Sequence, residues 1–237
     1  DNATAPPTGD QKPAPSAFQQ GRIAYRGGRY AEAETAFAQA VNQAPDHLWS
    51  WLQWSNSLRR QGRKDAAITT LEQLTEQLPN AADGWQNLAL LYQQQGLLAK
   101  ARQALENLVA IQPGNPDSIA LLADGLVLCQ ALDDAESLLR AATNGFGQQP
   151  KAIGLWHRLG HLLVQRGDKR KALIALHNGL LLDPSDSACA LAKATLLLEV
   201  GQPESALKTV NELLTYQPEQ IAALQRKAEI LQFMGEL

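Results

Sequence analysis

The sequence predicts an all-α protein made of repeated helical hairpins, because proline and glycine recur along it with a common period. The recurring prolines are spaced by 34 residues, with one interval of 37: Pro45, Pro79, Pro113, Pro150, Pro184 and Pro218. Glycines keep the same phase, at Gly28, Gly62, Gly96, Gly167, Gly201 and Gly235. A fixed period of this length is typical of stacked repeats rather than of one globular core.

The first half of one period, residues 82–115, predicts an amphipathic helix that ends at a glycine. Trp85, Leu88, Ala89 and Tyr92 are spaced as i, i+3, i+4 and i+7, which places them on one face of a helix. Gly96 follows this stripe and can adopt the left-handed conformation that ends a helix. The first half of each period is therefore predicted to form one helix, which we call the first helix of the repeat.

The second half of the same period predicts a second helix. Ala101, Ala104, Leu105 and Leu108 form its apolar stripe. Pro113 stops it, because proline cannot donate the next backbone hydrogen bond and disfavours helical geometry in the residue before it. The two helices can approach closely if the residues where their stripes face each other are small. Each first helix carries such a residue at the equivalent position: Gly21, Ser55, Ala89, Ala123, Gly160 and Ala194.

Extending the period in both directions divides the chain into elements in order. Residues 1–13 are proline-rich and are predicted to be a disordered leader. The array is predicted to cover 14–237, with six full repeats at 14–47, 48–81, 82–115, 116–152, 153–186 and 187–220, and the first helix of a seventh repeat, or a capping helix, at 221–237. Helices this short are marginal alone, so stacking must supply the core and the array should be an elongated solenoid.

The fourth repeat departs from the pattern. Gln130 stands where the other repeats carry glycine, and Ile119 replaces the tryptophan of the third. The segment 144–149 adds three residues before Pro150. We predict a longer connection at this point of the array.

These residues resemble the tetratricopeptide repeat family. Its motif of Trp, Leu-Gly or Leu-Ala, Tyr, Ala, Leu or Phe and a closing Pro is met in the third repeat by Trp85, Leu88, Ala89, Tyr92, Ala101, Leu105 and Pro113. The fifth repeat matches through Trp156, Leu159, Gly160, Gly167, Ala172 and Pro184. The resemblance implies a right-handed superhelical solenoid of helix-turn-helix hairpins, with a concave groove lined by first helices that binds protein partners.

Composition and charge exclude several other classes of function. The formal net charge is −3, from 21 Lys and Arg against 24 Asp and Glu, which gives no reason to expect a nucleic-acid partner. The longest apolar stretches are interrupted by Asp124 and Lys193, so neither is long enough to insert across a membrane. No nucleophile elbow, phosphate-binding loop or zinc-protease motif is present, which favours a non-enzymatic chain without a cofactor.

The resemblance assigns the binding groove to first-helix residues that lie off the packed stripe. The predicted groove residues are Phe18, Arg22, Tyr25, Trp49, Leu52, Asn56, Arg59, Gln86, Asn87, Leu90, Gln93, Asp124, His157 and His161. The N-terminal part combines aromatic rings with arginine, a combination enriched at interface hot spots. It predicts a partner peptide or helix with acidic and apolar side chains. The alternative is that Trp49 covers the preceding repeat and that Phe18 caps an exposed end of the array. Trp51 and Trp54 fall on the packed stripe and are predicted to be core residues.

His157 and His161 are spaced like a pair of metal ligands. At i and i+4 they share one helix face, but zinc needs three or four ligands, and Asp124 is the nearest third candidate. We therefore interpret the pair as a polar lining of the groove and predict no metal site.

Two functions fit this sequence. The first is a scaffold for protein-protein interaction in the assembly of a multiprotein complex. The second is the repeat arm of a larger enzyme, of the glycosyltransferase or sulfotransferase type, with its catalytic domain outside residues 1–237. The leader, and the absence of methionine before Met234, favour a bacterial protein exported to the periplasm or envelope, with the cytoplasm as the alternative compartment.

Overall fold

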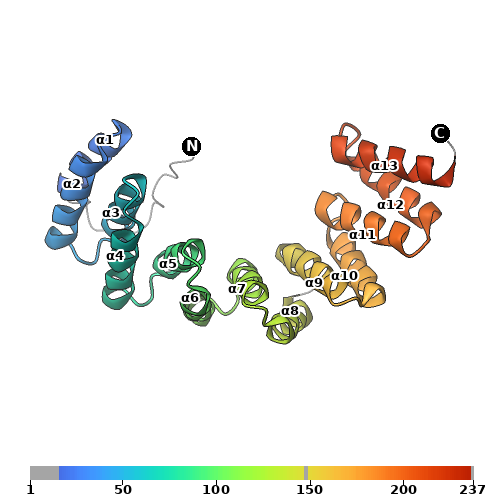
Figure 1. The fold of residues 1–237 in the computed structure, drawn as a ribbon, viewed down its shortest axis with the longest axis horizontal. Coiled ribbons are helices and arrows are strands. Elements are labelled where there is room, and N and C mark those ends of the chain that lie inside the picture. Colours follow the sequence, from blue (N-terminus) through green and yellow to red (C-terminus); the bar gives the residue numbers. More distant parts are fainter. Residues whose placement is uncertain (1–15, 147–148, 236–237) are drawn as a thin grey trace. The chain divides into compact units, whose positions relative to one another are not determined.

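The computed structural model describes residues 16–146 and 149–235, and these form thirteen α-helices, one short 3-10 helix and no strand (Figure 1). The predicted leader at 1–13 lies outside the described residues. The chain divides into two compact units, with the boundary between Ile111 and Gln112. The all-α class predicted from the period is confirmed.

Unit 1 consists of three helical hairpins. Its helices are α1 (Ser16–Arg26), α2 (Tyr30–Gln43), α3 (Leu48–Arg60), α4 (Lys64–Gln77), α5 (Ala82–Gln94) and α6 (Leu98–Ile111). Each odd-numbered helix packs against the even-numbered helix that follows it, and α2 and α4 also pack against the next hairpin. The hairpin stack expected from the short helices is present throughout this unit.

Unit 2 repeats this arrangement and ends in an additional helix. Its helices are α7 (Pro116–Leu128), α8 (Leu132–Phe146), α9 (Ile153–Gln165), α10 (Lys169–Leu182), α11 (Ser187–Glu199), α12 (Pro203–Tyr216) and α13 (Ile221–Met234), with the 3-10 helix η1 (Pro150–Ala152) before α9. Helix α13 packs on α12 and α11.

The connection after the fourth repeat is longer, as predicted. Helix α8 has 15 residues, whereas the second helices of the other described repeats have 14. The three inserted residues therefore extend α8 by one residue and lengthen the connection to α9, which includes η1. Residues 147 and 148 of this connection lie outside the described residues.

Each hairpin turns at a residue with left-handed backbone geometry. The six periodic glycines have φ between +72° and +82°. In the fourth repeat Gln130 takes the same place with φ +59°, the only non-glycine with positive φ among the described residues. Its backbone makes the same turn, since Ala131 donates its N–H to the carbonyl of Leu126. The Cβ atom of glutamine makes this conformation unfavourable by about 1–2 kcal/mol per residue.

We expect Gln130→Gly to stabilise unit 2 by about 0.5–1 kcal/mol, because relief of the left-handed strain exceeds the conformational entropy that glycine adds to the unfolded chain. The reverse change, Gly62→Gln, should destabilise unit 1 by a similar amount. Urea denaturation followed by circular dichroism measures both. Destabilisation by Gln130→Gly would show that the glutamine side chain contributes a contact that outweighs the strain.

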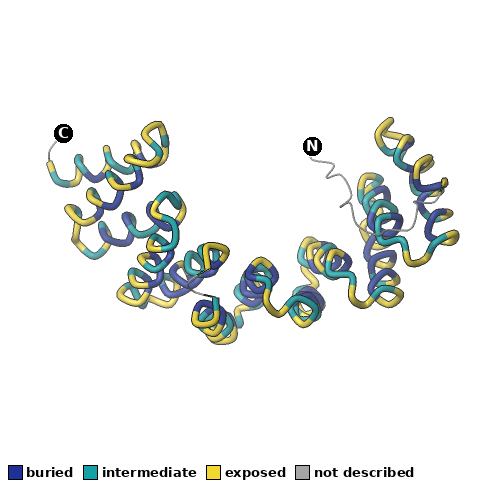
Figure 2. The backbone as a smooth tube through the Cα atoms, turned by 180° about the vertical axis from the view of Figure 1, so that it is seen from behind, coloured by how far each residue is buried: buried dark blue, intermediate teal, exposed yellow. Residues whose placement is uncertain are grey.

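The core of each hairpin lies where the two helices face each other, and the turns are exposed (Figure 2). Small residues line the closest approach, as predicted. A Cβ atom built on Gly21 would lie 2.6 Å from Phe37 Cε1, and one built on Gly160 would lie 2.7 Å from Leu176 Cγ. At Ser55 the hydroxyl donates a hydrogen bond to the carbonyl of Ala67 at 3.2 Å, so even this polar residue is satisfied within the hairpin.

Two tryptophans connect successive hairpins through their indole N–H groups. Trp51 Nε1 donates to the carbonyl of Pro45 at 2.9 Å, and Trp85 Nε1 donates to the carbonyl of Pro79 at 2.8 Å. Trp54 stacks on Trp51 with ring centroids 5.9 Å apart, but its buried Nε1 has no hydrogen-bond partner within the described residues. Trp51 and Trp54 are therefore packing residues, in agreement with their place on the predicted stripe.

The two rings should respond differently to removal of the indole nitrogen. Trp51→Phe should destabilise unit 1 by about 1 kcal/mol, because it removes a satisfied hydrogen bond. Trp54→Phe should be neutral or stabilising by up to about 1 kcal/mol, because it removes an unsatisfied buried donor while it keeps an aromatic ring. Thermal unfolding of the two variants side by side measures the difference, and equal losses would contradict it.

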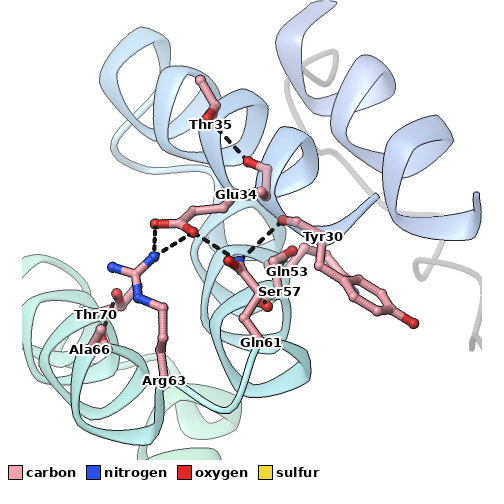
Figure 3. A network of polar contacts seen from close by, with 10 residues as sticks. Tyr30, Glu34, Thr35, Gln53, Ser57, Gln61, Arg63, Ala66 and Thr70 are labelled. Carbon is pink, nitrogen blue, oxygen red and sulfur yellow. Dashed lines mark hydrogen bonds and ion pairs between the residues drawn. The ribbon is translucent and has the colours of Figure 1, made fainter. Parts of the chain in front are cut away.

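Polar side chains also join successive hairpins in both units. In unit 1, Arg63 Nη1 lies 2.7 Å from Glu34 Oε2, and Gln61 Nε2 donates to the same carboxylate at 2.8 Å (Figure 3). This network ties α2 to the turn between α3 and α4. In unit 2, Arg166 Nη1 lies 3.0 Å from Glu136 Oε2, which ties α8 to the turn after α9. These side chains are therefore structural contacts between repeats.

Candidate functional site

One candidate surface lies on the first helices of unit 1. It consists of Arg22, Tyr25 and Arg26 on α1 and Arg59 and Arg60 on α3, and we call it the arginine surface. The two helices contribute equivalent positions, because Arg59 and Arg60 follow Tyr25 and Arg26 by 34 residues. Arg60 Nε donates to the hydroxyl of Tyr25 at 3.3 Å, so the two sets of side chains meet.

The arginine surface carries positive charge that no carboxylate of residues 16–146 or 149–235 pairs with. Residues 16–64 contain seven Lys and Arg against three Asp and Glu, a net charge of +4 in a chain whose total is −3. Two of the carboxylates are taken by other cations, since Glu32 pairs with Arg29 and Glu34 with Arg63. Within the described residues, the four guanidinium groups of the arginine surface form no ion pair with a carboxylate.

Two predicted groove residues, Phe18 and Leu52, are buried, which corrects their assignment. Each is 7% exposed. The ring of Phe18 lies against His47, just before α3, with centroids 4.8 Å apart, and against Phe37 at 5.6 Å. The neighbouring hairpin therefore covers the face of α1 around Phe18, one helical turn before Arg22. Trp49 is half-buried and packs on the same cluster, so it covers the core as well.

The remaining predicted residues of unit 1 give a polar, uncharged surface on α3 and α5. Asn56 accepts a hydrogen bond from Arg59 Nη1 at 3.3 Å. Asn87 donates to the carbonyl of Asp83 at 2.8 Å. Leu90 is 42% exposed and Gln86 is exposed, while Gln93 is half-buried. These side chains can supply hydrogen bonds and some apolar area, but no charge.

A second candidate surface is a recess of about 450 Å³ in unit 2, which brings together Asp124, His157 and His161. Its apolar lining includes Val127 and Leu128 of α7, and Leu128 is 52% exposed. The full lining is Ala123, Asp124, Val127, Leu128, Leu139, His157, Arg158, His161, Leu162 and Gln165. The recess is therefore an apolar floor with polar groups around it, a composition typical of side-chain binding sites.

The charged groups of this recess neutralise each other. Arg158 Nε donates to both carboxylate oxygens of Asp124, at 2.9 and 3.0 Å. Burial lowers the pKa of His157, and the nearby His161 and Arg158 lower it further, while Asp186 and Asp124 act in the opposite direction. Among the described residues no group of three His, Cys, Asp or Glu is arranged to hold a metal ion. The geometry offers a neutral histidine and a paired carboxylate rather than a ligand set.

Sequence reasoning missed three arginines of these surfaces, Arg26, Arg60 and Arg158, as well as the apolar lining of the recess. The signal for the first two was present, because Arg26 follows Arg22 by one helical turn and Arg60 follows Arg26 by one period. Arg158 could have been found as the opposite charge to Asp124 on the next first helix.

The described residues also contain no helix long and apolar enough to cross a membrane.

Two half-buried histidines, His47 and His157, should make the protein less stable in acid. Burial also lowers the pKa of His47 from its ordinary value of 6.5. Because their pKa values are lowered in the folded protein, both histidines bind a proton at a higher pH in the unfolded chain than in the folded chain. The free energy of unfolding therefore falls as the pH drops from 6.5 toward the pKa values of the folded state. We expect His47→Asn and His157→Asn to weaken this loss, in unit 1 and unit 2 respectively. Urea denaturation at a series of pH values tests it, and an unchanged slope in the double variant would contradict it.

Comparisons with known proteins agree on the repeat. A family model described as tetratricopeptide repeat matches residues 18–53 and 52–116. Cellulose synthase operon protein C of Pseudomonas fluorescens is 28% identical over 211 residues, which cover 83% of this chain and 16% of that protein. The chain spans between 14% and 17% of the length of the curated relatives it matches.

Solved structures share the fold. A tetratricopeptide repeat protein from Parabacteroides merdae has a TM-score of 0.62 at 16% identity, covering 93% of this chain and 86% of that one. YrrB, described as a tetratricopeptide repeat protein with an unusual peptide-binding site, has a TM-score of 0.54 at 19% identity, covering 81% of this chain and 98% of that one.

Proposed function

Because a tetratricopeptide repeat model matches residues 18–53 and 52–116 and solved tetratricopeptide repeat proteins share the fold, we propose that this chain is a non-enzymatic scaffold. It binds segments of protein partners on the exposed faces of its first helices. The fold supports protein-protein interaction and complex assembly, and YrrB provides a precedent for peptide binding on the same architecture. The absence of catalytic motifs in the sequence supports the non-enzymatic part of the proposal.

The arginine surface is the observation that carries the proposal. Four arginines on α1 and α3 have no carboxylate partner within the described residues, and one of them, Arg60, contacts Tyr25. The charge of residues 16–64 is opposite in sign to that of the whole chain. Guanidinium groups bind carboxylates through two parallel hydrogen bonds, and arginine and tyrosine are enriched at hot spots. The surface thus suits a partner segment with acidic side chains.

The recess of unit 2 suits a second segment of different chemistry. Its floor is apolar and its Asp124–Arg158 pair leaves no excess charge. An aliphatic or aromatic side chain would displace water from Val127 and Leu128, while His161 at the rim remains available for a hydrogen bond. Two surfaces of different character are what a scaffold that joins unlike partners requires.

The repeat arm of a larger enzyme, of the glycosyltransferase or sulfotransferase type, is the second candidate. The curated relatives are several times longer than the region that matches this chain. In that arrangement the same surfaces would hold the protein substrate of a catalytic domain, so the binding experiment below applies to both functions.

The experiment measures binding of a labelled peptide in which glutamate alternates with leucine, by fluorescence anisotropy. Arg22→Glu/Arg59→Glu should raise the Kd at least about tenfold, because a hydrogen bond to a charged group contributes about 1.5–3 kcal/mol. The control is Arg170→Glu/Lys208→Glu, which reverses two exposed charges in unit 2. A second control peptide carries lysine in place of glutamate and should not bind. Equal affinity of the wild type and the Arg22/Arg59 variant would exclude this surface.

A further inference from the structure

A lysine stands in the packed stripe of α11, at the position that the third, fourth and fifth repeats fill with leucine. The equivalent residues are Leu88, Leu122 and Leu159, which are 3%, 7% and 3% exposed. In the sixth repeat Lys193 takes this place, where it is half-buried and is the only charged residue of the stripe. Helices α10 and α12, which pack against α11, belong to the complete fifth and sixth hairpins.

The amino group of Lys193 meets a histidine and not a carboxylate. Its Nζ lies 3.5 Å from Nδ1 of His177, an exposed residue of α10. Glu212 of α12 lies 3.9 Å from Lys208 of the same helix, and Lys193 forms no ion pair with a carboxylate of residues 16–146 or 149–235. Lys193 therefore holds a half-buried amine that no anion neutralises.

This environment favours the unprotonated amine. Burial lowers the pKa of Lys193, the charge of Glu212 opposes this effect, and the charge of Lys208 adds to it. The unprotonated amine is the nucleophilic form of lysine, and each unit by which the pKa is lowered makes that form about tenfold more abundant at neutral pH. One ring nitrogen of a neutral histidine accepts a proton, so His177 can take the proton that the amine loses when it forms a bond. Lys193 and His177 together are a nucleophile with an adjacent base.

We propose that Lys193 is a modification site that takes the acyl group of a small acyl phosphate, with His177 as the base. The Nζ atom of Lys193 attacks the carbonyl carbon, the bond from that carbon to the phosphate oxygen breaks, and inorganic phosphate leaves. The amine proton passes to Nδ1 of His177 and from there to water. The donor has to be small because the amine is half-buried, and Lys208 supplies a positive charge near the departing phosphate.

Acylation would change the packing of the sixth hairpin. An acylated lysine is uncharged, so the packed stripe of α11 would no longer contain a charge and burial of the side chain at position 193 would become more favourable. Lys193 belongs neither to the arginine surface of unit 1 nor to the lining of the recess in unit 2. The modification site is therefore independent of both candidate binding surfaces.

The test treats the full chain with acetyl phosphate at about pH 7.5 and follows acetylation of each lysine by peptide mass spectrometry. Lys193 should react at least about threefold faster than Lys64 and Lys151, because more of it is unprotonated. Those two are internal controls, since both are exposed lysines of the same sample. In urea-unfolded protein the three rates should become alike, because the fold no longer holds the amine beside His177.

One variant isolates the contribution of His177. His177→Gln keeps a hydrogen-bond acceptor at this place but cannot take up a proton, so the rate at Lys193 should fall at least about threefold. The rates at Lys64 and Lys151 should stay the same, and circular dichroism confirms that the variant is folded. A Lys193 rate in the folded wild type that does not exceed those of Lys64 and Lys151 would overturn the modification site. An unchanged Lys193 rate in His177→Gln would exclude His177 as the base.

Discussion

Replacing Phe37 with alanine is expected to cost unit 1 about 3–5 kcal/mol of stability. Phe37 is fully buried, and the absence of a side chain on Gly21 leaves the space that its ring fills. The ring also contacts Phe18, with centroids 5.6 Å apart. Removing it empties the centre of the first hairpin, and Gly21 has no side chain that could move into the cavity.

Two further variants separate the cavity from other effects. Phe37→Leu introduces the residue found at the equivalent positions 71, 105, 139 and 176, and it should cost about 1–2 kcal/mol because most of the volume is retained. Phe233→Ala removes the same ring from α13, where it is 67% exposed, and should change stability by less than about 0.5 kcal/mol. Urea denaturation gives the total loss of stability in each variant, and hydrogen exchange should locate the loss caused by Phe37→Ala in helices α1–α3. If Phe37→Ala lost less stability than Phe37→Leu, the explanation by packing would be wrong.

The sequence predicted the hairpins well because the same physical requirements recur in each repeat. The φ values of Gly62 and Gly96, +76° and +72°, show why glycine returns at that position. Gln130 was recognised as an exception, but its conformation was not predictable, because only the fold shows that the backbone keeps the turn and takes the strain. The boundary between Ile111 and Gln112 was also not predictable. A periodic pattern treats every junction between repeats as equivalent.

The candidate site was predicted less well, because a helix face alone does not say what covers it. Arg22 and Phe18 lie one turn apart on α1, yet one belongs to the arginine surface and the other is 7% exposed. The difference arises from the packing of the next hairpin, which brings His47 over Phe18. Charge was the more reliable sign that a side chain is exposed, because burying a guanidinium group without a partner costs too much free energy.

Replacing Gly160 with leucine is expected to cost unit 2 about 3 kcal/mol, the upper end of the usual cost of overpacking. The first carbon of any side chain at this position would lie 2.7 Å from Leu176 Cγ, closer than atoms in proteins approach. Helices α9 and α10 would have to separate, and the contacts around the buried Leu159 and Leu163 would loosen. The control is Gly154→Leu on the same helix, where the Cβ atom would meet only the flexible end of Arg158, at 3.3 Å.

A double-mutant cycle shows whether the clash is specific to one neighbour. Leu176→Ala alone should cost about 2–5 kcal/mol through the cavity that it leaves. If the leucine at position 160 occupies that cavity, Gly160→Leu/Leu176→Ala should be more stable than the sum of the single losses implies, with a coupling of at least about 1 kcal/mol. Additive losses in denaturant unfolding would mean that the two helices separate as a whole. The small first-helix residues would then be required for backbone approach rather than for room around one side chain.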